Sequence, residues 1–254
     1  ELTIWFQNLK YLLILSKFLL QCQSNRWNAL EMTPPIAQKQ DPAADKTVKV
    51  FWLPKEVSQS HDQDSKACTL ISVLLVYNCH HSKVEFSSDN PGHHLLSAFR
   101  QSIDEGNKIY GKLQYDKMLK EKYLNIPEAL TAIKPSIKAP VAEWESFLYD
   151  GDLLETLYQN LRDKLELWYK RRPADAKSDA NVVILANLRA VVLLFSQRNG
   201  VVTLMDSHGH CPYGAVIALV SNSSLNFLCK WYAEQLTRDT GPVSCYELSF
   251  VYCK

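Results

Sequence analysis

The chain has 254 residues, of which 46% are hydrophobic and 22% are charged, and this composition is typical of a folded globular protein rather than a disordered one. Lys and Arg number 28 against 27 Asp and Glu, so the basic surface that nucleic-acid binding requires is missing, and we expect no nucleic-acid partner. The length suffices for one large domain or two small ones.

The N-terminal part of the chain differs in pattern from the rest. Residues 2–21 are strongly apolar with helical spacing, and they predict a helix with one wide buried face. Polar residues interrupt this stretch, so its longest apolar run is far shorter than the roughly 18 residues that a membrane-spanning helix needs, and we do not expect membrane association. The proline-containing stretch 31–47 predicts a linker, which places an N-terminal helix and linker at 1–47 and a folded domain at 48–254. Because the chain begins with Glu1 rather than Met, we expect it to be a piece of a longer protein.

The first half of the folded domain is predicted to be mostly helical. A short strand is expected at 48–53, and the almost wholly apolar run 67–77 is long for a strand, which favours a buried helix. Cys68 lies in the first turn of this helix, with Asp64 or Ser65 as the expected N-cap. Amphipathic spacing predicts further helices at 94–110 and 153–169, with a short turn or helix at 126–130.

The last quarter of the chain consists of apolar, β-branched segments that predict strands at 182–185, 190–196, 201–206, 214–220 and 245–252. The tripeptide Arg198-Asn199-Gly200 is typical of a tight turn and joins two of these strands into a hairpin. A helix is expected at 225–236. Helices followed by an antiparallel sheet predict an α+β fold.

The seven cysteines have irregular spacing and form no C-x-x-C pair, which argues against a disulfide framework and against a zinc ribbon. We therefore expect reduced thiols and a cytoplasmic or nuclear location. The histidines likewise lack metal-ligand spacing, so we expect neither a metal nor a cofactor. Glu143, Glu145 and Asp150 lie near Trp144, and we interpret them as a solvated face beside a buried Trp rather than as a glycosidase carboxylate pair.

One set of residues fits a catalytic thiol site: Cys68, Asp206 and His208. A reactive cysteine must form a thiolate, which a helix N-terminus and a neighbouring histidine both stabilise. Asp206 and His208 are two residues apart at the end of a predicted strand, so their side chains lie on one face, where the carboxylate can orient the imidazole. Structural alternatives remain open, because Cys68 also fits a core thiol and Asp-x-His also fits a turn.

The segments SKACTLISVLLVY, AVVLLFSQRNGVVTLMDSHGH and PYGAVIALVSNSSLNFLCKWYAEQL together resemble papain-like cysteine peptidases, and most of all the deubiquitinases of the herpesvirus large tegument protein type. The resemblance covers about 70 residues around the two motifs. It implies that Cys68 is the nucleophile, that His208 is the general base and acid, and that Asp206 is the orienting carboxylate. It also implies an upstream oxyanion glutamine, for which Gln63 is preferred over the more distant Gln59.

Two functions follow from the resemblance. The first is a thiol hydrolase that cleaves peptide or isopeptide bonds of ubiquitin or a ubiquitin-like protein, with these proteins as its partners. The second is a catalytically inactive papain-like domain that binds a protein partner. His210 competes with His208 for the role of base, and Thr69 follows the cysteine where related peptidases carry an aromatic or small polar residue.

Overall fold

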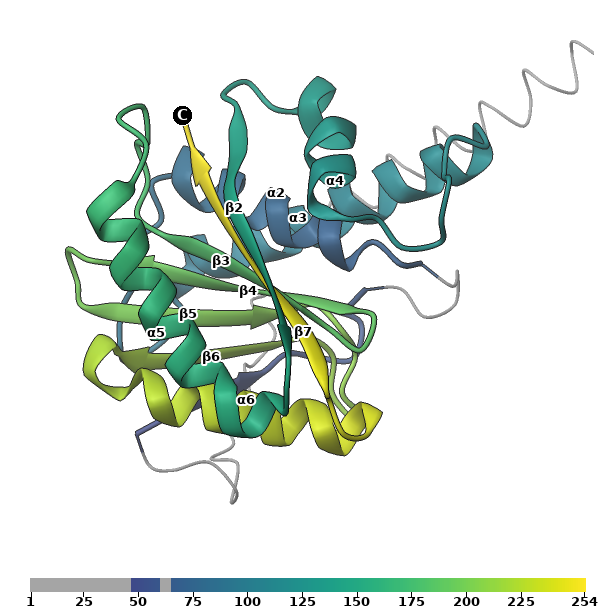
Figure 1. The fold of residues 1–254 in the computed structure, drawn as a ribbon. Coiled ribbons are helices and arrows are strands. Elements are labelled where there is room, and N and C mark those ends of the chain that lie inside the picture. The colour runs from purple at the N-terminus through teal and green to yellow at the C-terminus, as the bar shows by residue number, and fades with distance from the viewer. Residues whose placement is uncertain (1–46, 60–64) are drawn as a thin grey trace, which may run out of the picture. The chain divides into compact units, whose positions relative to one another are not determined.

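The computed structural model describes residues 47–59 and 65–254, and its centre is a seven-stranded antiparallel sheet (Figure 1). The predicted N-terminal helix and nearly all of the linker lie outside the described residues. The strands follow one another across the sheet in the order β1-β6-β5-β4-β3-β7-β2, and every neighbouring pair is antiparallel. Their bounds are β1 Lys49–Trp52, β2 Val141–Asp150, β3 Asn181–Ala186, β4 Arg189–Ser196, β5 Val201–Asp206, β6 Val216–Ser221 and β7 Cys245–Cys253.

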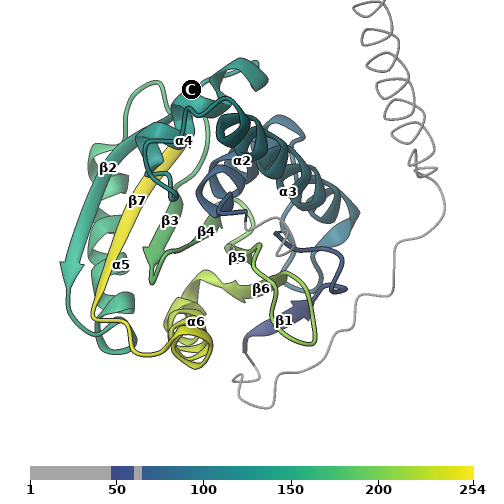
Figure 2. The same ribbon diagram turned by 90° about the vertical axis from the view of Figure 1, so that its right-hand side faces the viewer.

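Helices cover both faces of the sheet (Figures 1 and 2). On one face lie α2 (Cys68–His81), α3 (Gly92–Tyr115) and α4 (Ile126–Ile133), and on the other lie α5 (Leu153–Arg171) and α6 (Leu225–Thr240). Two short 3₁₀ turns, at Lys134–Ser136 and Asn222–Ser224, follow α4 and precede α6. The predicted class, helices combined with an antiparallel sheet, is confirmed. The added finding is that the late helix α6 and the amphipathic α5 form a second layer.

The central strands are apolar along their whole length because both of their faces are buried. In β4, Val191 and Leu193 pack toward α5 and α6, whereas Val192 and Leu194 pack toward α2 and α3. Side chains alternate between the two faces of a strand, so a sheet covered on both sides requires a continuous apolar run. The predicted strands of the last quarter are all present for this reason.

Helix α2 is buried on nearly every side because it lies between the sheet and α3. Gly106 of α3 makes this packing possible, since a Cβ at this position would lie 2.5 Å from Cγ1 of Ile71. Helix α5, by contrast, buries one stripe consisting of Leu157, Leu161, Leu165 and Trp168. None of the helices within residues 47–59 and 65–254 is long and apolar enough to cross a membrane.

One strand was not predicted from the sequence, and one expected helix cap was wrong. The segment around Trp144 is β2, an edge strand paired with β7, with a bulge between Glu143 and Glu145. Glu145 and Asp150 are exposed on this edge and Glu143 is partly exposed, as expected for a solvated face, and these charges masked the strand pattern in the sequence. The N-cap of α2 is Ala67, which makes no side-chain capping bond, whereas the Ser65 hydroxyl donates to Oδ1 of Asn107 at 2.8 Å.

Candidate active site

The Cys68 thiol lies at the first residue of α2, where the sequence predicted a reactive cysteine. Its side chain is buried, and Sγ lies 4.0 Å from the carbonyl oxygen of Leu188. Leu188 and Asn187 form the two-residue turn between β3 and β4, and both have a positive φ, 62° and 46°. A left-handed conformation is unfavourable for Leu, by about 1 kcal/mol, so the sheet holds this turn beside the thiol at an energetic cost.

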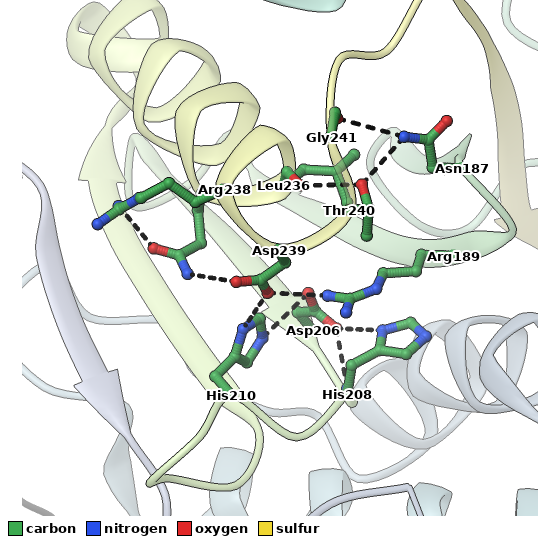
Figure 3. A network of polar contacts seen from close by, with 11 residues as sticks. Asn187, Arg189, Asp206, His208, His210, Leu236, Arg238, Asp239, Thr240 and Gly241 are labelled. Atoms are coloured by element: carbon green, nitrogen blue, oxygen red, sulfur yellow. Dashed lines mark hydrogen bonds and ion pairs between the residues drawn. The ribbon is translucent and has the colours of Figure 1, made fainter.

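Asp206 and His208 lie where β5 ends, on the same side of the chain (Figure 3). Nδ1 of His208 donates to Oδ1 of Asp206 at 2.6 Å, and the backbone N–H of His208 donates to the same oxygen at 2.9 Å. Both side chains are buried. The carboxylate therefore fixes the orientation of the imidazole and its Nδ1–H tautomer, which leaves Nε2 for the thiol.

Cys68 and His208 are coupled electrostatically, and each shifts the pKa of the other toward its charged form. Burial would raise the pKa of Cys68, but the hydrogen bond and charge of His208 and the backbone of Ala190 bring this pKa below its usual value of 9.0. Burial would lower the pKa of His208, but Asp206 and Cys68 raise it to about 9. This arrangement favours a thiolate–imidazolium pair near neutral pH.

The other described cysteines differ from Cys68. Burial raises the pKa of Cys79, Cys229 and Cys253 to about 12, which keeps these three as inert thiols of the core. Cys211 and Cys245 are exposed. All six cysteines within the described residues are free, and among those whose pKa is shifted, only Cys68 has a lowered pKa.

The two histidines that competed for the role of base occupy different places. His208 is the histidine that lowers the pKa of Cys68, whereas Nδ1 of His210 lies 2.9 Å from Oδ2 of Asp239 on α6. Nε2 of His210 lies 3.3 Å from Oδ2 of Asp206, on the side of that carboxylate opposite His208 (Figure 3). His210 is therefore a partner of Asp206 and not of Cys68.

The preferred oxyanion residue, Gln63, lies outside the described residues, and the structure places the alternative, Gln59, beside the site. The backbone N–H of Gln59 donates to the carbonyl of Ser207 at 2.6 Å, and its side-chain amide donates to the carbonyl of Ser65 at 2.5 Å. Its Oε1 atom is buried and has no hydrogen-bond partner among the described residues. Gln59 thus links two backbone segments, Ser207 just before His208 and Ser65 just before α2.

Close backbone packing holds the Gln59 segment in place. The N–H of Gly214 donates to the carbonyl of Leu53 at 2.9 Å, and the N–H of Ala215 donates to the carbonyl of Val57 at 2.7 Å. A Cβ on Gly214 would lie 2.5 Å from the Val57 carbonyl oxygen, so only glycine allows this approach.

Sequence analysis missed several residues around the site. Asp239 and Arg189 extend the polar contacts beyond His210, and the hairpin residues Leu188 and Ala190 contact the thiol through their backbone. No local motif marks these four positions. The turn itself could have been predicted only from Asn187, since Asn is frequent between two apolar strands whereas Leu, the next residue, is uncommon in a turn.

Comparison with protein-family models returns no match, and comparison with curated protein sequences returns none either. Among solved structures, the chain is similar to the ubiquitin-specific protease encoded by murine cytomegalovirus tegument protein M48, solved in complex with a ubiquitin-based suicide substrate. That match has a TM-score of 0.51 and 12% identity, and it covers 81% of this chain and 86% of that chain. The Pseudomonas avirulence protein AvrPphB matches with a TM-score of 0.41, 13% identity and coverage of 75% and 92%, a score too low to add to the argument. At these identities the likeness concerns the fold, and the described part of the chain has a papain-like fold.

Proposed function

We propose that this protein is a cysteine hydrolase of the papain-like type that cleaves peptide or isopeptide bonds. The observation that carries the proposal is the position of Cys68 at the N-terminus of a buried helix, where its pKa is lowered by His208, an imidazole that Asp206 holds at 2.6 Å. A core cysteine has no need of a buried imidazole and carboxylate, whose burial is unfavourable unless their charges are paired.

The proposed reaction is acyl transfer through the Cys68 sulfur. The thiolate attacks the carbonyl carbon, a C–S bond forms, and the proton on His208 moves to the leaving amine as the C–N bond breaks. His208 then accepts a proton from water, whose oxygen attacks the thioester, and the C–S bond breaks to release the acid. The side-chain amide of Gln59 or Gln63 is proposed to donate a hydrogen bond to the developing oxyanion.

We further propose that the substrate is ubiquitin or a ubiquitin-like protein and that the protein works in the cytoplasm or nucleus. The substrate proposal is supported by the similarity in fold to a protein described as a ubiquitin-specific protease. The location is supported by the free thiols of the described residues, which suit a reducing compartment.

Two labelling experiments test the proposal. Iodoacetamide at pH 6 should alkylate Cys68 faster than the exposed Cys211 and Cys245, which serve as internal controls within the same molecule, with mass spectrometry to locate each adduct. A ubiquitin-derived suicide substrate should attach to Cys68 alone. If Cys68 is alkylated more slowly than the two exposed cysteines, the hydrolase proposal is wrong. If it is alkylated quickly but the ubiquitin reagent does not attach, only the substrate proposal is wrong.

A further inference from the structure

The orienting carboxylate, Asp206, has a histidine on each side. Its Oδ1 accepts the two hydrogen bonds from His208, and its Oδ2 lies 3.3 Å from Nε2 of His210. The carboxylate is almost fully buried, so its charge must be compensated by neighbours rather than by water. A Cys-His-Asp triad requires only the contact of Asp206 with His208, and His210 has no part in the proposed acyl transfer.

His210 is itself held firmly. Its Nδ1 lies 2.9 Å from Oδ2 of Asp239, and its ring packs edge-on against the ring of Trp52 at a centroid distance of 5.3 Å. Nε2 is buried and makes no contact with the geometry of a hydrogen bond, although it faces Asp206. Asp239 is in turn held by Arg189 at 3.0 Å and by the side-chain amide of Gln235 at 3.3 Å.

These contacts form a chain of alternating charges that runs from His208 through Asp206, His210 and Asp239 to Arg189 (Figure 3). The charged and titratable groups around His210 are Asp206 and His208 from the end of β5, Arg189 from β4, and Asp239 and Tyr232 from α6. Burial would lower the pKa of His210, but Asp206 and Asp239 raise it to about 9. Burial and the charge of Asp206 raise the pKa of Tyr232 well above its usual value, so this phenol stays neutral.

We propose that His210 is a positioning residue for the proposed hydrolase, one that holds Oδ2 of Asp206 as a second imidazolium and thereby directs Oδ1 at His208. Asp239 fixes His210 from the opposite side. The inference rests on the proposed function for its effect on turnover, but its effect on Cys68 is measurable without any substrate. Because the charge of Asp206 raises the pKa of Cys68, an imidazolium of His210 that offsets this charge should favour loss of the Cys68 proton.

The test uses two substitutions, each of which keeps a hydrogen-bond donor at the position of one ring nitrogen of His210. His210→Gln places an amide N–H where Nε2 faces Asp206, and His210→Asn keeps a donor only toward Asp239. Both remove the cation, so the pH at which Cys68 alkylation reaches half its maximal rate should rise by about one pH unit in both variants. With a substrate that the wild-type protein cleaves, kcat should fall about tenfold more in the Asn variant than in the Gln variant, with KM unchanged.

Asp239→Asn provides a second route to the same answer if the His210 variants do not fold. His210 then loses its proton nearer to neutral pH, so the alkylation midpoint should move in the same direction by a smaller amount. Asp175→Asn is the matched control, since it removes a carboxylate that is paired with Lys254 at 3.2 Å and has no contact with the chain of charges. The midpoint of that variant should stay at the wild-type value.

The possible results separate the two proposals. A folded His210→Gln protein with an unchanged alkylation midpoint would overturn the positioning role, even if its turnover were reduced. A wild-type protein whose Cys68 is alkylated readily but that cleaves no substrate would overturn the hydrolase proposal, while the midpoints would still decide the role of His210.

Discussion

Helices α2 and α5 begin in opposite ways. At α5, Asp152 accepts hydrogen bonds from the N–H groups of Leu154 and Glu155 at 2.8 and 3.3 Å, a side-chain cap of the usual kind. At α2, Ala67 has no side-chain oxygen to accept a capping hydrogen bond, and Cys68 follows it at the first helical position. A capping carboxylate at α2 would compete with the thiolate for the free N–H groups and repel its charge. The start of α5 is thus optimised for stability and the start of α2 for the proposed chemistry.

The first helical residue of each helix offers the strongest test of this difference. Cys68→Ala should lower the turnover number by about 10⁴- to 10⁶-fold, because the nucleophile is lost, and leave the melting temperature nearly unchanged. Turnover of a peptide or ubiquitin-derived amide, together with thermal unfolding, measures both effects. Cys245→Ala, at an exposed thiol, is the control. Substantial residual turnover by Cys68→Ala would assign the nucleophile elsewhere.

The equivalent change in α5, Leu153→Ala, should have the reverse effect. Leu153 is fully buried, so its truncation should lower the free energy of unfolding by about 2–5 kcal/mol. The rate of Cys68 alkylation should stay the same at temperatures where the variant is folded. Urea unfolding gives the free energy of unfolding, and labelling of the same sample gives the rate of Cys68 alkylation. A large loss of Cys68 reactivity would show that the N-termini of α2 and α5 are coupled.

The pH dependence of the free energy of unfolding reports on the titrating residues beside the start of α2, which are Cys68, His208 and His210. Within the Cys68–His208 pair the two shifts oppose each other, since the pKa of Cys68 is lowered from 9.0, which favours loss of a proton on folding, and that of His208 is raised from 6.5 to about 9, which favours uptake of one. His210, with a pKa raised from 6.5 to about 9, holds one extra proton when folded. Its contribution is complete below pH 6.5 and is lost as the pH rises to about 9.

The free energy of unfolding should therefore fall by up to about 3 kcal/mol from pH 6.5 to 9, and His210→Gln should flatten this slope. Asp206 and Asp239, with lowered pKa values, stabilise the fold above pH 3.8, and that contribution disappears as the pH falls below this value. Urea titrations across the range measure the slope. A stability that rises between pH 6.5 and 9 would contradict an imidazolium at position 210.

The smallest effect is expected from the cap itself. Asp152→Ala should lower the free energy of unfolding by about 1 kcal/mol, because two N–H groups of α5 lose their acceptor. Asp152→Asn should recover most of this loss, since its amide oxygen can still cap. Cys68 alkylation should be unaffected in both variants, and a change in its rate would mean that the start of α5 acts on the site.

Sequence patterns predicted the parts of the molecule whose structure depends on near neighbours in the chain. The apolar run of β4, the hairpin through Asn199-Gly200 and the spacing of Asp206 and His208 all follow from local periodicity. The contact of His210 with Asp239 joins residues 29 positions apart on a loop and a helix, and no periodicity reports it. Strand β2 was missed because its partly exposed face carries charges, and the predicted cap of α2 was wrong because Ala67, which has no side-chain acceptor, occupies the N-cap position.

The separation of Cys68 from His208 along the chain has a consequence for synthesis. His208, which lowers the pKa of the thiol, is 140 positions downstream, and β4, whose backbone also contacts the thiol, is itself over a hundred positions later. At about 5–20 residues per second, the ribosome needs roughly 7–28 s after adding Cys68 before His208 exists. Throughout that interval the cysteine on the nascent chain is an ordinary thiol, so reactivity arises only once the domain is almost fully translated.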